Sequence, residues 1–462
     1  MEPKIKIQDF SYDLPSERIA KYPLERRDAS KLLIYNNGKN GDILESSFFT
    51  LSSYIPNNSL MVFNNTRVVP ARLFFKKETG ALIEIFCLEP VEPNDYALNF
   101  ASKECCSWNV VIGNAKKWKG GEVFLMLDNA SEEAKMLNLR AELIYKGDNN
   151  GSVVKFKWDT GCSFSEVLDI CGRIPIPPYL NRDTEELDYE RYQTLYARIK
   201  GSVAAPTAGL HFTENVFNEL DSKGVDRETV CLHVGAGTFV PVKSEYIADH
   251  KMHTEPFEVT KEFLKKLCAL EEGQKVVAVG TTSTRTLESL YFLGVQCIEN
   301  GAPVAVEQWE PYRKEYGYTM KEAIGAIVKY LDDKGLDKLV ARTGIIIVPS
   351  YKFRVVDMLV TNFHQPQSTL LLLISAFIGG DDWKRIYNYD NLNFLIILSR
   401  LDLHNLHKAS FSKFRSQRKS CPHPSSICIA ISLSSFGTVS IQICSGHKGL
   451  NIPPFHMLLE WF

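Results

Sequence analysis

The chain has 462 residues, enough for two or three domains that each bury a hydrophobic core. An apolar fraction of 45%, a charged fraction of 23% and a formal charge of −2 are typical of a soluble globular protein and exclude a global basic field. None of the 11 cysteines forms a C-x-x-C pair and the N-terminus lacks a secretory signal, so we expect a cytoplasmic protein with reduced thiols and no membrane span.

The predicted secondary structure of the first 171 residues changes at about residue 68. A short capped helix is predicted over 16–21 and strands over 31–35 and 59–63. From residue 68 to residue 171, strand-like segments alternate with turns that contain Gly and Asn, which predicts a small all-β unit. Its expected strands cover residues 81–88, 108–112, 123–127, 140–145 and 153–158.

After a proline-stiffened connection at 172–180, helices and strands alternate, which is typical of α/β architecture. Helices are expected over residues 214–223, 261–270, 284–293, 318–331 and 368–377. Strands are expected over residues 228–234, 275–279, 343–348 and 358–361. The predicted fold is therefore an α/β catalytic domain made of residues 1–67 and 172–389, with the small all-β domain of residues 68–171 inserted into it.

The last part of the chain differs from the rest. Residues 391–462 contain seven Lys or Arg against two Asp or Glu, which leaves the first 390 residues with a net charge of −7. The same stretch has weak periodicity. We expect residues 390–462 to be a divergent tail that does not belong to the preceding fold and need not be ordered.

Two runs, at 201–211 and 232–239, couple a histidine to small residues that let backbone approach a ligand closely. All five histidines before the tail lie in turn-like contexts, which favours a polar cleft; they are His211, His233, His250, His253 and His364. These runs indicate an enzyme.

The segment from His250 to Glu255 has the spacing of a metal site if it is helical. Pro256 and the alternation after it favour a strand instead, so we expect no metal. A substrate-gripping or proton-shuttling role for His253 and Glu255 is the favoured interpretation. A metal-dependent hydrolase that uses His250, His253 and Glu255 stays as an alternative.

Two strand–turn–helix junctions, at 276–283 and 360–369, carry polar side chains. Such a junction offers backbone N–H groups and the positive end of a helix dipole to an anion. Simple N-capping by Thr282 or Ser283 is the alternative, although capping alone requires neither Gly280 nor Arg285. Two such junctions predict a site along one edge of a sheet. Dinucleotide, P-loop and α/β-hydrolase motifs are absent from the sequence.

Basic residues gather in four places, and tyrosines accompany one of them, so RNA binding is a further possibility on residue chemistry alone. The groups are Arg26 and Arg27; Arg67, Arg72, Lys76 and Lys77; Lys116, Lys117 and Lys119; and Arg182, Arg191, Arg198 and Lys200. The accompanying tyrosines are Tyr179, Tyr189, Tyr192 and Tyr196.

Ordered motifs across about residues 8–389 make the chain resemble the S-adenosylmethionine:tRNA ribosyltransferase-isomerase family of queuosine biosynthesis. They lie at residues 12–15, 22–30, 63–73, 172–179, 191–194, 201–213, 232–242, 253–255, 279–283, 285–289, 361–364 and 368–380. The resemblance implies a larger α/β domain with a barrel-like sheet and an inserted smaller all-β domain.

The resemblance also implies the reaction. The ribosyl part of S-adenosylmethionine is transferred to 7-aminomethyl-7-deazaguanine at the tRNA wobble position and isomerised, which gives epoxyqueuosine-tRNA, adenine and methionine. S-adenosylmethionine is then a substrate, tRNA is the partner, and no cofactor or metal is expected.

Roles follow for the matching residues. A base would remove the proton beside the sulfonium, and we assign it to His253 or His233, with Glu255 orienting it. The turn at 280–283 and Arg285 would hold the methionine carboxylate. Arg67 and Arg191 would meet tRNA phosphate or line the cleft wall. The substrate-binding candidates are Arg67, Tyr192, Gln193, Ala205, Pro206, Thr207, Gly209, His211, Phe212, Gly235, Gly237, Thr238, Gly280, Thr281, Thr282, Ser283, Arg285, Asn362, His364 and Ser368.

One departure from the family pattern follows Asn388, where the family's short C-terminal strand motif is missing. Without that strand, ladder donors and apolar surface would stay uncovered. A catalytically impaired tRNA-binding homologue is therefore the alternative function.

Overall fold

The computed structural model describes residues 3–36, 42–128, 130–147, 151–235, 242, 244–388, 394–399, 428–433 and 439–444. The chain divides into two compact units, Met1–His404 and Asn405–Phe462. In the second unit, β19 (Cys428–Leu433) and β20 (Val439–Cys444) form an antiparallel hairpin.

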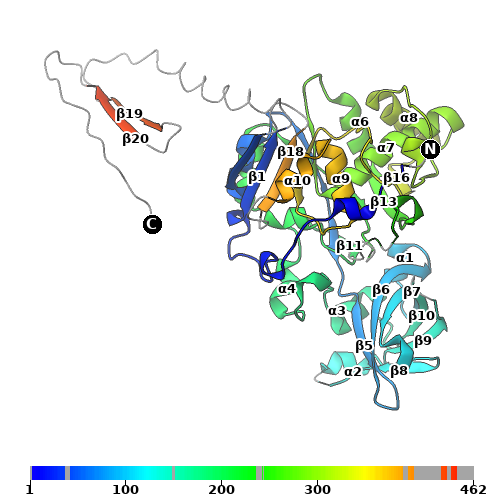
Figure 1. The fold of residues 1–462 in the computed structure, drawn as a ribbon. Coiled ribbons are helices and arrows are strands. Elements are labelled where there is room, and N and C mark those ends of the chain that lie inside the picture. Colours follow the sequence, from blue (N-terminus) through cyan, green and yellow to red (C-terminus); the bar gives the residue numbers. More distant parts are fainter. Residues whose placement is uncertain are drawn as a thin grey trace. The chain divides into compact units, whose positions relative to one another are not determined.

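A ten-stranded mixed sheet forms the larger part of the first unit (Figure 1). Its strand order is β15 (Ala305–Val306), β16 (Lys338–Thr343), β13 (Glu255–Thr260), β12 (Asp226–Leu232), β3 (Leu60–Asn64), β14 (Val276–Val279), β17 (Met358–Asn362), β18 (Phe394–Ser399), β1 (Lys31–Asn36) and β2 (Asp42–Ser47). The four neighbours β12, β3, β14 and β17 run parallel to one another. Their carboxyl ends therefore meet at one edge of the sheet.

Six helices of the described residues accompany this sheet. Four of them have side-chain caps, namely α5 (Glu214–Ser222), α6 (Lys261–Ala269), α8 (Met320–Lys334) and α9 (Thr369–Ile378), whereas α7 (Thr281–Asn300) and α10 (Asp382–Tyr387) have none. The hydroxyls of Thr213, Thr260 and Ser368 accept N-terminal N–H groups, and Thr319 with Glu322 forms a capping box. In Figure 1, α6, α7 and α8 lie together, and α9 and α10 form another pair.

The main hydrophobic core joins these helices to the sheet. Leu290 and Leu293 of α7, Ile324 and Ile327 of α8, and Leu371 of α9 belong to one buried cluster with strand residues. Burial of such large aliphatic side chains stabilises each by about 1.5–3 kcal/mol relative to exposure. The long helix α7 is thereby fixed, and with it the junction where α7 begins.

A closed six-stranded barrel forms the second part. Its order is β10 (Ser152–Lys157), β7 (Cys105–Gly113), β6 (Leu82–Glu92), β5 (Arg72–Lys76), β8 (Glu122–Leu125) and β9 (Arg140–Tyr145). Buried and less buried residues alternate along β5 and β10, as a barrel with a filled interior requires. The interior holds large aromatic side chains such as Trp108, Trp118 and Phe156.

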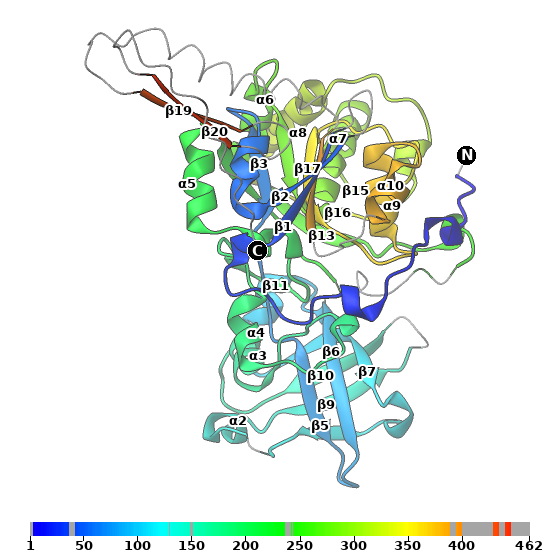
Figure 2. The same ribbon diagram turned by 60° about the vertical axis from the view of Figure 1, so that its left-hand side comes forward.

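Short elements accompany the barrel. They are α1 (Tyr96–Phe100), α2 (Glu132–Met136), α3 (Phe164–Cys171), α4 (Glu186–Arg191), β4 (Thr66–Val68) and β11 (Ile199–Ser202). The pair β4 and β11 is parallel, and β11 lies between the barrel and the large sheet in both views (Figures 1 and 2).

The observed fold is thus mixed α/β with a closed barrel, and most predicted elements are confirmed. The barrel-like sheet was expected in the larger domain, but the large sheet is open, with β15 and β2 as its edge strands. The closed barrel is formed instead by strands of the β-rich segment. That segment also contains α1, α2 and α3, which its strand-rich pattern does not signal. The strand expected at 343–348 is wrong: β16 ends at Thr343, and the buried apolar run after it is irregular backbone.

The expected loss of the C-terminal strand is also wrong. Residues Phe394–Ser399 form β18, which pairs antiparallel with β17 and parallel with β1. A ladder needs backbone donors and acceptors in register, and these residues supply them without matching the family's motif. Among the described residues, no helix is both long and apolar enough to cross a lipid bilayer.

Candidate functional site

The candidate site lies at the carboxyl edge of the four parallel strands, where ligands of α/β sheets usually bind. The strands end at Leu232, Asn64, Val279 and Asn362, so both polar strand–turn–helix junctions reach this edge. The 3₁₀ helix η7 (Thr207–His211) crosses it, because a Cβ on Gly280 would lie 3.9 Å from the Cβ of Ala208. Gly280 itself has a φ of +87°, which favours glycine.

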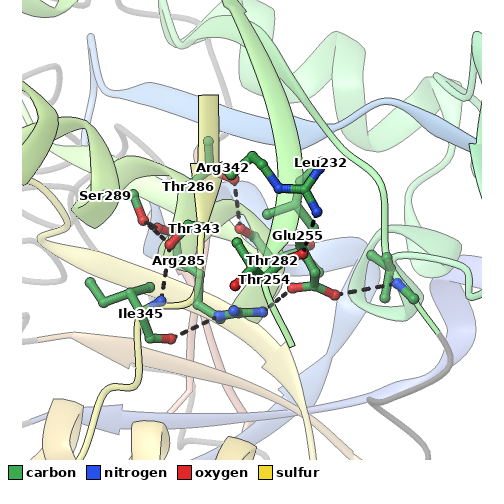
Figure 3. Close-up of polar contacts among 12 residues, drawn as sticks. Leu232, Thr254, Glu255, Thr282, Arg285, Thr286, Ser289, Arg342, Thr343 and Ile345 are labelled. Carbon is green, nitrogen blue, oxygen red and sulfur yellow. Dashed lines mark hydrogen bonds and ion pairs between the residues drawn. The ribbon is translucent and has the colours of Figure 1, made fainter. Parts of the chain in front are cut away.

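A buried ion pair joins Glu255, at the start of β13, to Arg285 in the second turn of α7 (Figure 3). Both side chains are only 6% exposed. Arg285 Nε also donates to the Ile345 carbonyl at 3.3 Å, and Glu255 Oε1 accepts the Gly235 N–H at 3.3 Å. Glu255 is therefore committed to Arg285 and to the backbone, and no hydrogen bond between described residues connects it to His253.

Two polar atoms beside this pair lack partners. Arg285 Nη2 and Thr282 Oγ1 are buried and accept or donate no hydrogen bond within the described part of the chain. Buried polar atoms are normally satisfied, so orphaned ones need an explanation, and a bound ligand supplies one. The Arg285 charge is already balanced by Glu255, but its second terminal nitrogen can still bind an oxygen.

His233 is enclosed by its surroundings. It follows β12, is 6% exposed, and its Nδ1 lies 3.0 Å from the Gly201 carbonyl oxygen. Because a carbonyl only accepts, Nδ1 carries the proton, and Nε2 faces the Cys231 thiol at 3.6 Å. Burial lowers the pKa of His233. Because Nδ1 is held by a carbonyl and Nε2 faces a buried thiol, this arrangement disfavours the base role that we expected of His233 as one of two options.

His253 has the opposite environment. It is exposed in the segment that precedes β13, where the strand interpretation of this region is confirmed. His250 is partly buried, and burial together with the charge of His253 lowers its pKa. Among the described residues, no group of three or more His, Cys, Asp or Glu side chains is placed to hold a metal ion.

His211 and His364 lie at the end of β17. The Nδ1 of His211 is 2.8 Å from Ser30 Oγ and its Nε2 is 3.5 Å from Asn362 Nδ2, while His364 Nε2 is 2.9 Å from Thr361 Oγ1. Burial lowers the pKa of each histidine to about 4. Both imidazoles are therefore neutral near pH 7 and serve as hydrogen-bonding groups.

The remaining candidates divide between open and structural positions. Arg67 on β4 is exposed, whereas Gln193 exchanges two hydrogen bonds with the Val68 backbone. The Ser283 hydroxyl donates to the Val279 carbonyl, and Ser368 caps α9. Buried positions are Tyr192, Ala205, Pro206, Gly209, Phe212, Gly280 and Thr281, and partly buried ones are Thr207 and Gly235. Gly237 and Thr238 lie outside the described residues.

Several residues of the site were not predicted. Tyr96 of α1 stacks on His233, and Arg342 of β16 donates to the Thr254 carbonyl at 3.2 Å. Burial raises the pKa of Glu89 on β6, and the nearby charges of Arg342 and His253 lower it, so this carboxylate also lies near the edge. Ser30 contacts His211. These residues come from distant segments with no local motif, and only the tertiary fold brings them to this edge.

Most residues of the four basic groups form ion pairs or hydrogen bonds with other residues of the chain. Arg182 pairs with Asp188, Lys200 with Asp169, and Arg191 donates to the carbonyls of Glu25 and Leu24. By contrast, Lys116, Lys117 and Lys119 are exposed on the barrel and form no ion pair with the described residues. Three further basic residues are likewise occupied: Arg26 with Asp28, Arg72 with Glu84, and Lys76 with Asp128.

Comparison with known proteins decides the family. The model of a family described as queuosine biosynthesis protein matches residues 7–390. The S-adenosylmethionine:tRNA ribosyltransferase-isomerase of Treponema denticola is 37% identical over 385 residues, which are 83% of this chain and 94% of that protein. The chain belongs to the queuosine biosynthesis protein family. The matched residues include the barrel and the carboxyl edge.

Two further relatives agree in name. The S-adenosylmethionine:tRNA ribosyltransferase-isomerase of Fusobacterium nucleatum is 36% identical over 383 residues, covering 83% of this chain and 91% of that protein. A crystal structure of S-adenosylmethionine tRNA ribosyltransferase from Thermotoga maritima is 26% identical, covers 84% of this chain and 99% of that one, and has a TM-score of 0.37. The names of the Treponema denticola and Fusobacterium nucleatum proteins give no support to the alternative of a catalytically impaired homologue.

Proposed function

We propose that this protein is an S-adenosylmethionine-dependent tRNA ribosyltransferase-isomerase. It transfers the ribosyl moiety of S-adenosylmethionine to 7-aminomethyl-7-deazaguanine at the tRNA wobble position and isomerises it. The products are epoxyqueuosine-tRNA, adenine and methionine. The observation that carries this proposal is family membership across residues 7–390, together with two curated relatives of that name at 36–37% identity.

The donor substrate is proposed to lie along the carboxyl edge. The first turn of α7, a helix of 20 residues, offers N–H groups and the positive end of a helix dipole to the methionine carboxylate. Thr282 Oγ1 and Arg285 Nη2 are the unpartnered polar atoms at this place. The segment 201–211, which passes Gly280 at η7, would then lie against the nucleoside.

The chemistry requires a base, because the positive sulfur acidifies the neighbouring ribose carbon. Of the two histidines considered for this role, His253 is exposed and His233 is enclosed by Gly201, Cys231 and Tyr96. The proposal therefore favours His253 as the histidine that takes part in proton transfer. The positively charged sulfur of S-adenosylmethionine can leave as the neutral thioether of methionine without further activation. The proposal therefore includes no metal and no organic cofactor.

The acceptor is a tRNA in the cytoplasm. Arg67, exposed on β4 near the edge, and the exposed lysines Lys116, Lys117 and Lys119 of the barrel are the cations left to meet phosphates. We propose that the barrel segment, residues 68–171, is a domain built on the β-barrel, with the short helices α1, α2 and α3, and inserted into the catalytic domain of residues 1–67 and 172–389. Its separate hydrophobic cluster supports this division.

An adenine-release assay tests the proposal. The purified full chain is incubated with S-adenosylmethionine and tRNA that carries the aminomethyl-deazaguanine base, and adenine is quantified. Adenine should appear in proportion to modified tRNA, and a matched tRNA with guanine at the wobble position should give none. If saturating amounts of both substrates release no adenine, the protein does not catalyse this reaction.

A further inference from the structure

Glu89 occupies an irregular position near the end of a barrel strand. The pairing of β6 with β7 shifts register between Cys87 and Glu89, and again between Pro90 and Glu92. Such irregularities bend a strand and redirect its side chains, and they are frequent beside active sites. Glu89 thus lies where β6 leaves regular barrel geometry, opposite Asn109 of β7.

The Glu89 carboxylate reaches the carboxyl edge of the large sheet. A Cβ placed on Gly235, just after β12, would be 3.9 Å from Glu89 Oε1. The N–H of the same Gly235 donates to Glu255, so two carboxylates from different parts of the chain approach one glycine. Tyr96, whose ring covers His233, also has its pKa raised by burial first and then by the charges of Glu89 and Glu255.

The two carboxylates differ in what they bind. Glu255 is buried against Arg285 and accepts a backbone N–H. Glu89 is only partly buried, and within the described residues no hydrogen bond or ion pair holds its carboxylate. Burial raises the pKa of Glu89, the charges of Arg342 and His253 lower it, and the charge of Glu255 raises it. Glu89 is therefore the carboxylate that is able to take up a proton at this edge.

We propose that Glu89 is a catalytic residue, the general base that removes the proton from the ribose carbon beside the sulfonium, with the exposed His253 exchanging that proton with water. In this step the C–H bond breaks and its electron pair stays on the carbon next to the positive sulfur. The proton passes to the Glu89 carboxylate, which becomes a neutral carboxylic acid. The inference rests on the proposed function and gives it a residue from the barrel, so that the site is complete only when barrel and sheet are together.

The test compares Glu89→Gln with Glu92→Gln. Glu92 lies on the same strand, is exposed, and is opposite Ser107, so its replacement controls for the loss of one barrel charge. Adenine release is measured in single turnover with precursor tRNA, and binding of S-adenosylmethionine is measured separately by calorimetry. We expect Glu89→Gln to slow release by on the order of 100-fold or more while the dissociation constant for S-adenosylmethionine stays within about twofold. Glu92→Gln should behave as the unsubstituted protein.

The pH profile adds a readout that a structural role would not move. Since the base must be ionised, kcat/KM of the unsubstituted protein should fall on acidification through the raised pKa of Glu89, and Glu89→Gln should lack that acid limb. The groups facing Glu89 are Arg342, His253, Glu255 and Tyr96, and they are unchanged in both variants. Glu89→Asp, which keeps the carboxylate, should recover part of the rate.

The outcomes are distinguishable. If the unsubstituted protein releases no adenine, the proposed function fails. If it is active and Glu89→Gln keeps its rate within threefold or keeps the acid limb, only the role of Glu89 is overturned. If Glu89→Gln loses rate and S-adenosylmethionine binding together, Glu89 is a binding residue and the base assignment is likewise wrong. Matching urea midpoints of the two Gln variants verify that both are folded.

Discussion

The imidazole ring of His233 stacks on the phenol ring of Tyr96, with the ring centroids 4.3 Å apart and the planes inclined by 7°. His233 follows β12 of the large sheet, whereas Tyr96 begins α1 in the barrel segment. His233 Nδ1 also donates to the Gly201 carbonyl at 3.0 Å. The His233 side chain thus contacts both α1 of the barrel segment and β11, and these contacts hold the barrel, with Glu89, next to the carboxyl edge.

Gly201→Ala should break this joint. Gly201 has a φ of +142°, and a Cβ there would lie 2.4 Å from His233 Nδ1, so either the ring or the backbone must move. We expect the free energy of unfolding to fall by about 1–3 kcal/mol, the usual cost of such backbone strain. Urea denaturation measures it. Gly317→Ala is the control, since a Cβ on Gly317 meets nothing within 4 Å, and equal midpoints for the two variants would contradict the prediction.

The buried pair Glu255 and Arg285 should show strong coupling. Arg285→Met leaves the Glu255 carboxylate buried without its partner, which typically costs about 3–5 kcal/mol. The double variant Glu255→Leu, Arg285→Met removes both charges and should recover much of that loss. A double-mutant cycle in urea tests this expectation. Additive losses in the double variant would show that the pair is not coupled.

The neutral histidines predict an acid sensitivity. Burial lowers the pKa of His211 and of His364 to about 4, below the value of about 6.5 for an unfolded histidine. Between these values the unfolded chain binds the proton and the folded chain does not, so stability is lost as the pH falls from 6.5 to 4. Each histidine contributes a slope of up to about 1.4 kcal/mol per pH unit.

Denaturation series at pH 7, 6 and 5 measure this slope. His364→Asn keeps a polar side chain but removes the titrating group, so stability should decline less steeply with acid than in the unsubstituted protein. Carboxylates also titrate in this range, and the comparison between the two proteins cancels their contribution. Parallel curves would mean that His364 binds protons equally in the folded and unfolded states, so that burial does not lower its pKa.

How far the sequence predicts this molecule depends on the range of each interaction. Helices α5, α6 and α9 are predicted because their apolar periodicity and their caps Thr213, Thr260 and Ser368 are local. The site edge is predictable as well, since consecutive parallel strands place their carboxyl ends together. These features need only neighbouring residues and a general rule of topology.

The partners of the site residues are not predictable in this way. Nothing near Arg285 in the sequence indicates that its charge is balanced by Glu255, and nothing near Glu89 on the barrel indicates that it approaches Gly235 beside the large sheet. These contacts depend on how the barrel packs on the sheet. The environments of His233 and His253 also differ for this reason, although both histidines lie in similar polar turns.

The strand β18 yields a prediction about the C-terminal part of the chain. Phe394–Ser399 fills the place between β17 and β1 and pairs with both along their lengths. A chain that ends at Asn388 would leave two unpaired strand edges in the middle of the sheet, and we expect it to be insoluble or to unfold at a much lower temperature. A chain that ends at His404, the boundary of the first unit, should melt as the full chain does and release adenine at the same rate. Thermal melts and the adenine assay on the two truncations measure this; equal melting temperatures would show that β18 does not hold the sheet together.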